Sequence, residues 1–235
     1  MRKLTALLLA VALLLGLSSA LADAVITVTG SGETLVTADT AVVSVGVNIR
    51  NTDALKAQSE ANEAVARIRA ALTGAGFDEE DISTGYINLY AVYDYSREIE
   101  QIAAYNASSS LAVRVRDMTR VGEVIDLAFS AGANTLDGVS FSVSDDSAAR
   151  EESLRKAVAD ARKKAAVLAE AAGFGDIEIE AIQEGGVYSY DSGANNFAVK
   201  VAGAAEFARE DAATVVRAAK ICVSASVTVT FKEKE

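Results

Sequence analysis

Apolar residues recur with two different periods between Thr40 and Ser144. Four segments place them at every second position, as half-buried strands do: Val43–Ile49, Ile87–Tyr93, Leu111–Val115 and Val139–Val143. Two other segments, after Asp53 and after Asp117, repeat them every three or four positions, as amphipathic helices do. The resulting order, β-α-β-β-α-β, is the split βαβ pattern, in which two helices cover one face of an antiparallel sheet. We therefore predict an α+β fold with this core over residues 40–144.

Residues 145–235 are expected to extend the core with one helix and further strands. The helix follows Asp146 or Ser147 and ends at Gly173, with one apolar stripe: Leu154, Val158, Ala161, Ala165, Leu168 and Ala172. Strands near Ile177–Ile182 and over Ile221–Phe231 follow, and the short strand Val25–Thr29 could pair with the last one.

The segment Gly185–Ala213 has no sustained strand pattern. It is rich in Gly, Ser, Asn and Ala, so we expect a mobile excursion. A short helix could form around Glu206–Arg217, toward the end of this segment. We expect no chemistry in this segment.

Residues 1–22 have the three-part layout of a secretory signal. Arg2 and Lys3 precede an apolar run that ends at Leu17, and small residues lead to Ala22. The run is shorter than the roughly 20 residues that cross a bilayer, so we expect cleavage after Ala22 rather than anchoring. The sequence thus predicts one domain over 23–235 with no integral membrane span, in the periplasm, the cell envelope or the extracellular space.

The chain is acidic, with a formal charge of −11 that becomes −13 when Arg2 and Lys3 leave with the signal. Such a surface repels phosphate backbones and anionic headgroups, so we expect no binding to nucleic acid or to membrane surfaces. Cationic partners and divalent ions could still bind such a surface. Keeping an exported protein soluble is the simpler explanation of the charge.

Missing residue types exclude several reaction classes. There is no His, so there is no Ser-His-Asp triad, no Cys-His pair and no imidazole ligand for a metal. One Cys allows no internal disulfide. We expect no catalytic, cofactor-binding or metal residues and a protein that is not an enzyme. A hydrolase or ion-binding protein based on Asp and Glu is a further hypothesis, although no spacing marks a pair.

Cys222 is the candidate reactive thiol. Ile221 and Val223 belong to the apolar face of the last strand, so Cys222 points the other way, together with Ser224. The thiol could be accessible to solvent, could pair with a second subunit, or could be covered by a neighbouring element. Thiol-dependent redox activity through Cys222 is therefore the alternative function.

Five of the seven tyrosines flank one predicted hairpin, whose tip lies near Ser96–Gln101: Tyr86, Tyr90, Tyr93, Tyr95 and Tyr105. Ordinary sheet packing explains any one of them. Because aromatic residues with a polar end are enriched at protein interfaces, the cluster is the candidate surface for self-association or for an envelope protein partner.

Two short motifs have simple structural interpretations. Gly30-Ser31-Gly32 lacks the third glycine of a dinucleotide-binding loop, and we expect a tight turn there. Asp145-Asp146 precedes the long helix and is expected to cap it, with half of a calcium site as the rarer alternative.

Several segments, in this order and spacing, resemble the SIMPL-domain family, which includes the YggE-type and periplasmic immunogenic proteins of bacteria. They are Val28–Gly32, Ile82–Leu89, Tyr93–Tyr95, Tyr105–Ser108, Val113–Asp117, Val121–Asp126, Ala131–Asn134, Gly138–Phe141, Ala157–Ala166 and Val223–Val227. One departure is the link Ala212–Lys220, which lacks the prolines usual there.

The resemblance implies an exported domain. Some members are linked to tolerance of oxidative stress, and some assemble into large hollow homo-oligomers. It supplies no established catalytic residue. Together with the residues above, it predicts a non-enzymatic protein that acts by homo-oligomeric assembly or by partner binding.

Overall fold

The computed structural model describes residues 25–95, 101–192 and 214–234. The expected cleavage site after Ala22 lies outside these residues. The strands are β1 (Val25–Thr37), β2 (Thr40–Asn51), β3 (Ile82–Asp94), β4 (Gln101–Val115), β5 (Thr135–Ser142), β6 (Ile177–Asp191) and β7 (Lys220–Glu233). The helices are α2 (Ala54–Gly74), α3 (Val121–Ser130) and α4 (Ser147–Ala172), with 3₁₀ turns η1 (Glu79–Asp81) and η2 (Met118–Arg120).

The chain divides into two compact units. The core unit comprises Glu33–Glu151 and Tyr188–Ser224, and the second unit comprises Met1–Gly32, Glu152–Val187 and Ala225–Glu235. Each unit is described by itself below.

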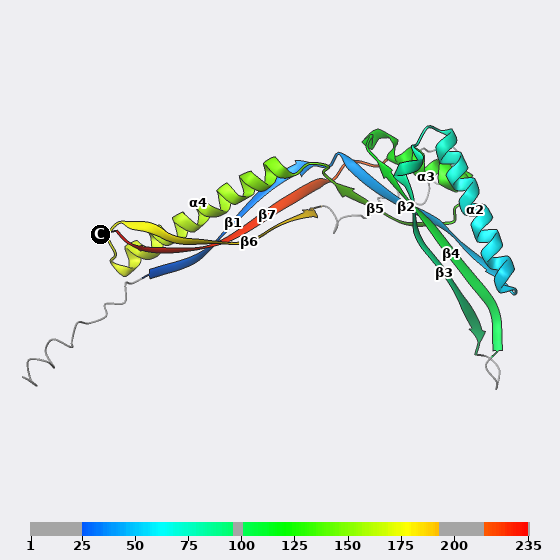
Figure 1. Cartoon of the computed structure of the whole chain (residues 1–235), viewed down its shortest axis with the longest axis horizontal. Coiled ribbons are helices and arrows are strands. Elements are labelled where there is room, and N and C mark those ends of the chain that lie inside the picture. Colours follow the sequence, from blue (N-terminus) through cyan, green and yellow to red (C-terminus); the bar gives the residue numbers. More distant parts are fainter. Residues whose placement is uncertain (1–24, 96–100, 193–213, 235) are drawn as a thin grey trace, which may run out of the picture. The chain divides into compact units, whose positions relative to one another are not determined.

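A four-stranded sheet in the order β3-β4-β2-β5 forms the core unit, and its neighbouring strands pair antiparallel. Helices α2 and α3 lie on one face of it (Figure 1). Val43, Val45 and Val47 of β2 are buried under them with apolar residues of β4. This arrangement confirms the predicted α+β fold and its split βαβ core.

Helix α2 begins where the sequence indicates. The Asp53 carboxylate accepts the Lys56 backbone N–H at 3.0 Å, and the chain leaves the helix through Gly76, whose φ is 85°. The buried side of α2 consists of Ala57, Ala61, Ala64, Ile68 and Leu72. Val65, predicted to be in this stripe, is only half-buried.

The other sheet has the order β1-β7-β6, which confirms the pairing of the first strand with the last. In the second unit, α4 packs on it through Ala157, Ala161 and Ala165. The apolar stripe predicted for α4 is therefore partly wrong, because Leu168 is 48% exposed. The buried side holds small residues, since the helix backbone approaches β1 too closely for larger ones.

Gly30 and Gly32 allow that approach, and the tight turn predicted for Gly30-Ser31-Gly32 is wrong. Both glycines lie inside β1. A Cβ on Gly30 would overlap the carbonyl oxygen of Ala157, and one on Gly32 would overlap that of Ser153. The missing side chains make room for the backbone of α4.

Two expectations for the later part of the chain are also wrong. Strand β6 continues to Asp191, so 185–191 is not an excursion. Glycine is tolerated there because Gly185 lies against the Ser226 backbone, where a Cβ would come within 3.2 Å of the carbonyl oxygen. Residues 193–213 lie outside the described part.

The helix expected around Glu206–Arg217 does not include Thr214–Arg217, which has no helical structure. The Thr214 backbone N–H and hydroxyl donate to the Asp126 carboxylate of α3, at 3.1 and 2.6 Å. These bonds replace helical ones. Within the described residues, no helix is long and apolar enough to cross a membrane.

Candidate functional site

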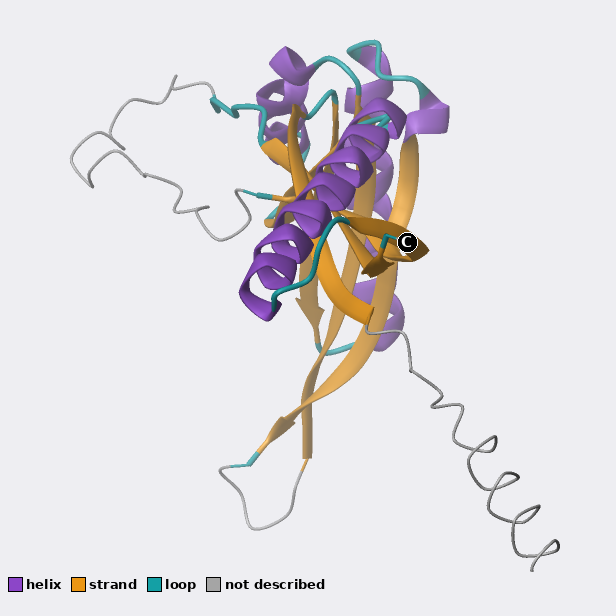
Figure 2. Ribbon diagram, turned by 90° about the vertical axis from the view of Figure 1, so that its left-hand side faces the viewer, coloured by secondary structure: helices purple, strands orange, loops and turns teal. Residues whose placement is uncertain are grey.

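The predicted hairpin is formed by β3 and β4, whose register runs from Ile82 opposite Val113 to Asp94 opposite Gln101. Strand β3 is an edge of the sheet. Strand β2 ends at Asn51, opposite Tyr105, so only β3 and β4 continue beyond that point. We call this two-stranded end, Ala91–Tyr95 with Gln101–Tyr105, the arm (Figures 1 and 2).

The five tyrosines do not form one patch. Tyr105 is half-buried and packs against the core. Tyr86 and Tyr90 lie on the sheet face opposite to the helices, because they alternate with Ile87, which faces α2. The structure brings together only Tyr93 and Tyr95, whose ring centroids are 6.3 Å apart.

Tyr86 and Tyr90 are held by neighbouring side chains. A bulge in β3 turns Tyr86 so that its N–H donates to Ser110 Oγ at 3.1 Å and its hydroxyl donates to the Asp137 carboxylate. Burial, and then the charge of Asp137, raise the pKa of Tyr86. The Tyr90 hydroxyl accepts from Asn106 Nδ2 at 2.7 Å. These contacts explain both tyrosines as parts of the sheet.

Three large side chains of the arm are exposed, whereas Ala104 is buried. Tyr93 is 42% exposed, Tyr95 77% and Ile102 49%. Asp94 is the one charged residue among the ten that form the arm. Sequence reasoning found these tyrosines but not their separation from the other three, which depends on strand alternation and on the end of β2.

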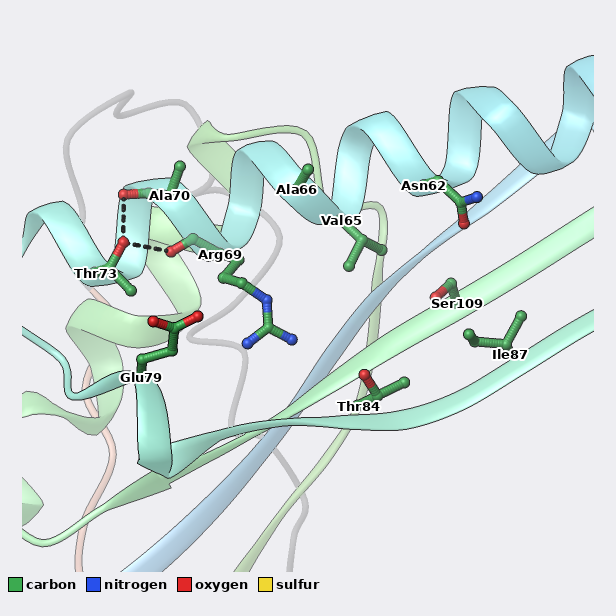
Figure 3. Close-up of a pocket in the computed structure, with 10 residues that line it drawn as sticks. All are labelled: Asn62, Val65, Ala66, Arg69, Ala70, Thr73, Glu79, Thr84, Ile87 and Ser109. Carbon is green, nitrogen blue, oxygen red and sulfur yellow. Dashed lines mark hydrogen bonds between the residues drawn. The ribbon is translucent and has the colours of Figure 1, made fainter.

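A groove between α2 and β3 was missed from the sequence. It has a volume of about 490 Å³, and its walls include Val65 and Arg69 of α2 and Thr84 and Ile87 of β3 (Figure 3). Arg69 Nη1 donates to the Ile82 carbonyl at 2.8 Å. The groove exists because α2 packs over β2 and β4 and leaves β3 largely uncovered. The sequence contained one signal for this groove, which is that Val65 makes the apolar stripe of the helix wider. In the structure Val65 is half-buried and lies at the rim of the groove.

Cys222 is buried, with 3% exposure, so the thiol is covered by a neighbouring element rather than accessible. The cover includes Tyr190 of β6, whose pKa is raised by its hydrogen bond to Cys222 and by the charges of Cys222 and Glu33. Because β6 was expected to end near Ile182, Tyr190 was not predicted to lie beside Cys222. The geometry does not favour redox chemistry at Cys222.

Of the two acidic residues before α4, only Asp145 accepts a backbone N–H with its side chain, whereas the Asp146 carboxylate binds two side chains. Asp145 Oδ1 accepts the Ser147 N–H at 2.9 Å, and the Asp146 carboxylate bonds Arg150 and Ser189. Those bonds lower the pKa of Asp146, with the one from Arg150 contributing most. In the described part of the chain, no group of three or more Cys, Asp or Glu side chains could hold a metal.

A cavity of about 530 Å³ at one end of the core sheet contains Arg114, Arg116 and Asp39. Arg116 Nη2 lies 2.9 Å from Asp81 Oδ1, and Arg114 Nη1 lies 3.9 Å from it. Asp39 accepts from the backbone and hydroxyl of Ser144 at 2.8 and 2.6 Å. The two cations are thus balanced by two carboxylates, and the cavity is no strong anion site.

Comparison with known proteins identifies relatives of the chain. It is 34% identical over 155 residues to the 26 kDa periplasmic immunogenic protein of Brucella melitensis and 33% identical to that of Brucella abortus. Each match covers 64% of this chain and 62% of the relative. The uncharacterized protein YggE of Escherichia coli is 28% identical over 131 residues, which are 56% of this chain and 53% of YggE.

The chain therefore matches less than two thirds of the length of these relatives. A family model covers more of it. The model described as SIMPL, a protein of unknown function (DUF541), matches residues 26–231. Because this match extends from β1 to β7 and covers most of the chain, the chain belongs to the SIMPL family.

Proposed function

We propose that this chain is an extracytoplasmic, non-enzymatic protein that acts by association of identical copies through the arm. The Brucella relatives are named periplasmic proteins, which supports the location. The observation that carries the proposal is the exposure of Tyr93, Tyr95 and Ile102 on a ribbon to which no other described strand is added. An isolated two-stranded ribbon is marginally stable in water, so the arm gains stability when another surface covers it.

Charge supports the arm as the place of contact. Copies that carry a formal charge of −11 or more repel one another over most of their surface. The two strands of the arm carry a single charged residue, Asp94, whereas the sequence that joins them contains Arg97, Glu98 and Glu100, so repulsion is low for contact along the strands themselves. Exposed tyrosines also bury large areas with few rotatable bonds, which favours them at interfaces.

The test is the solution mass of residues 23–235 by light scattering, with and without reductant. We expect a defined oligomer that is insensitive to reductant and that Tyr93→Ser with Tyr95→Ser dissociates. Tyr188→Ser is the matched control, because Tyr188 is 67% exposed but lies in β6. An unchanged mass in the arm variant, or equal dissociation in the control, contradicts the proposal.

The proposal extends to tolerance of oxidative stress, with assembly rather than thiol chemistry as its basis, because Cys222 is buried. Survival of peroxide-treated cells that express the wild type, the arm variant or Cys222→Ser separates the two routes. We expect Cys222→Ser to protect as the wild type does and the arm variant to fail. The opposite pattern would revive the thiol alternative.

A further inference from the structure

The outer edge of β3 has the properties of a strand-binding site. It belongs to a strand of 13 residues, and none of the described strands pairs with its outer side. From Ile82 to Tyr93 the strand has neither a charged residue nor a proline. Proteins usually protect long edge strands with lysine, proline or bulges. The pairing of β3 with β4 is irregular between Thr84 and Ile87 and between Val92 and Tyr93, but the regular stretch between these points has no charged residue and no proline, so it can pair with another chain.

The groove between α2 and β3 lies beside this edge and can receive side chains. Ile87 of β3 is 62% exposed and lines the groove. The half-buried Val65 of α2 faces the same space (Figure 3). A strand added to β3 directs every second side chain toward the helix side of the sheet. An apolar side chain at those positions covers Ile87.

Negative charge before the first residue of β3 indicates which kind of segment the edge would bind. Asp78, Glu79, Glu80 and Asp81 directly precede the strand, and the first three are exposed. Asp81 is paired with Arg116, whereas the side chains of the other three form no salt bridge in the described part of the chain. A basic residue on the incoming strand can pair with them.

We propose that β3 and the α2–β3 groove bind an extended segment of another polypeptide by strand addition. The segment runs antiparallel to β3, has apolar residues at alternate positions and carries basic residues at its carboxyl end, which meets Asp78–Asp81. The site uses Ile82–Tyr90, the part of β3 that precedes the arm, and does not depend on the proposed assembly.

The test measures fluorescence anisotropy of a fluorescein-labelled synthetic peptide in which valine and threonine alternate and two lysines follow. We expect the full chain to bind it, and Ile87→Lys to weaken binding by about tenfold or more. Leu35→Lys is the matched control, because Leu35 is also 62% exposed but lies in β1. A second peptide, with proline in place of each threonine, loses every second backbone N–H and has its φ angles fixed outside the usual strand values, so it is expected to bind much more weakly.

Equal binding of the proline peptide, equal weakening by Leu35→Lys, or no binding of the alternating peptide overturns the proposal. A lower solution mass of Ile87→Lys without any peptide binding would assign the groove to a second copy of this chain instead. The arm variant keeps peptide binding if the two sites are separate, so failure of the assembly proposal leaves this test intact.

Discussion

Gly30 of β1 lies directly against the backbone of Ala157 in α4. A Cβ at position 30 would overlap the Ala157 carbonyl oxygen and would come within 2.7 Å of the Ala161 backbone nitrogen. Neither backbone atom can turn aside as a flexible side chain could. The distance between strand and helix in the second unit is therefore fixed by the absence of side chains.

Gly30→Ala is expected to destabilise the protein by about 2 kcal/mol or more, because an added methyl group in a packed region forces backbone shifts. Thermal unfolding followed by circular dichroism measures the change. Gly74→Ala is the control, since nothing lies within 4 Å of a Cβ at position 74 and alanine favours a helix. We expect Gly74→Ala to leave the melting temperature unchanged or to raise it.

Cys222 is expected to react slowly with a small alkylating reagent in the native protein and quickly after unfolding. The reason is its 3% exposure beneath Tyr190. Mass spectrometry of timed samples, with and without urea, measures both rates. Tyr190→Ala is expected to speed the native reaction, and equal rates in native and unfolded protein would show that the thiol is not covered.

Acid is expected to destabilise the core unit. Hydrogen bonds from Ser144, and a weaker one from Thr40, lower the pKa of Asp39 from its ordinary value of 3.8. A carboxyl group with a lowered folded pKa adds stability above its unfolded pKa and loses it as the pH falls through the folded pKa. The expected loss thus begins near pH 4 and continues below it.

Urea unfolding across this pH range tests that loss. Asp39→Asn removes the titrating group and is expected to flatten the acid side of the profile. Asp78→Asn serves as the control, because the Asp78 side chain makes no capping hydrogen bond. An Asp39→Asn profile as steep as that of the wild type would contradict the assignment.

Asp137→Asn is expected to lower the pKa of Tyr86 toward its ordinary value of 10.0, because the charge and the hydrogen bond of Asp137 both raise it. Burial, the largest cause, remains in the variant, so the decrease is partial. Nuclear magnetic resonance of the labelled tyrosine ring carbons, titrated from neutral to alkaline pH, follows the change. A titration of Tyr86 that is identical in both proteins would show that its hydroxyl does not contact Asp137.

Periodicity was sufficient to predict the core unit. The two helices and the four strands of residues 40–144 all occur, and β2 and β4 bury apolar residues against the helices. Strand β3 is an exception, because Ile87 and Leu89 of its predicted apolar face are exposed. Local pattern also predicted the pairing of the first and last strands. These features depend on which residues are apolar, and the sequence states that directly.

The features that were not predicted from the sequence depend on contacts between segments that are distant along the chain. Tyr190 covers Cys222 only because β6 extends to Asp191, and glycine-rich sequence concealed that extension. Gly30 and Gly32 belong to a strand because α4 needs the space, which no local rule for glycine pairs could reveal. The α2–β3 groove likewise follows from where α2 comes to lie over the sheet.

The uncharged length of β3 also bears on how the protein behaves in concentrated solution. Salt shortens the range of electrostatic repulsion to roughly 10 Å at 0.1 M, and this removes the main force that keeps acidic molecules apart. Contacts along Ile82–Tyr93 contain no ion pair that salt could weaken. Raising the ionic strength is therefore expected to lower the barrier to encounter without weakening contacts along this strand.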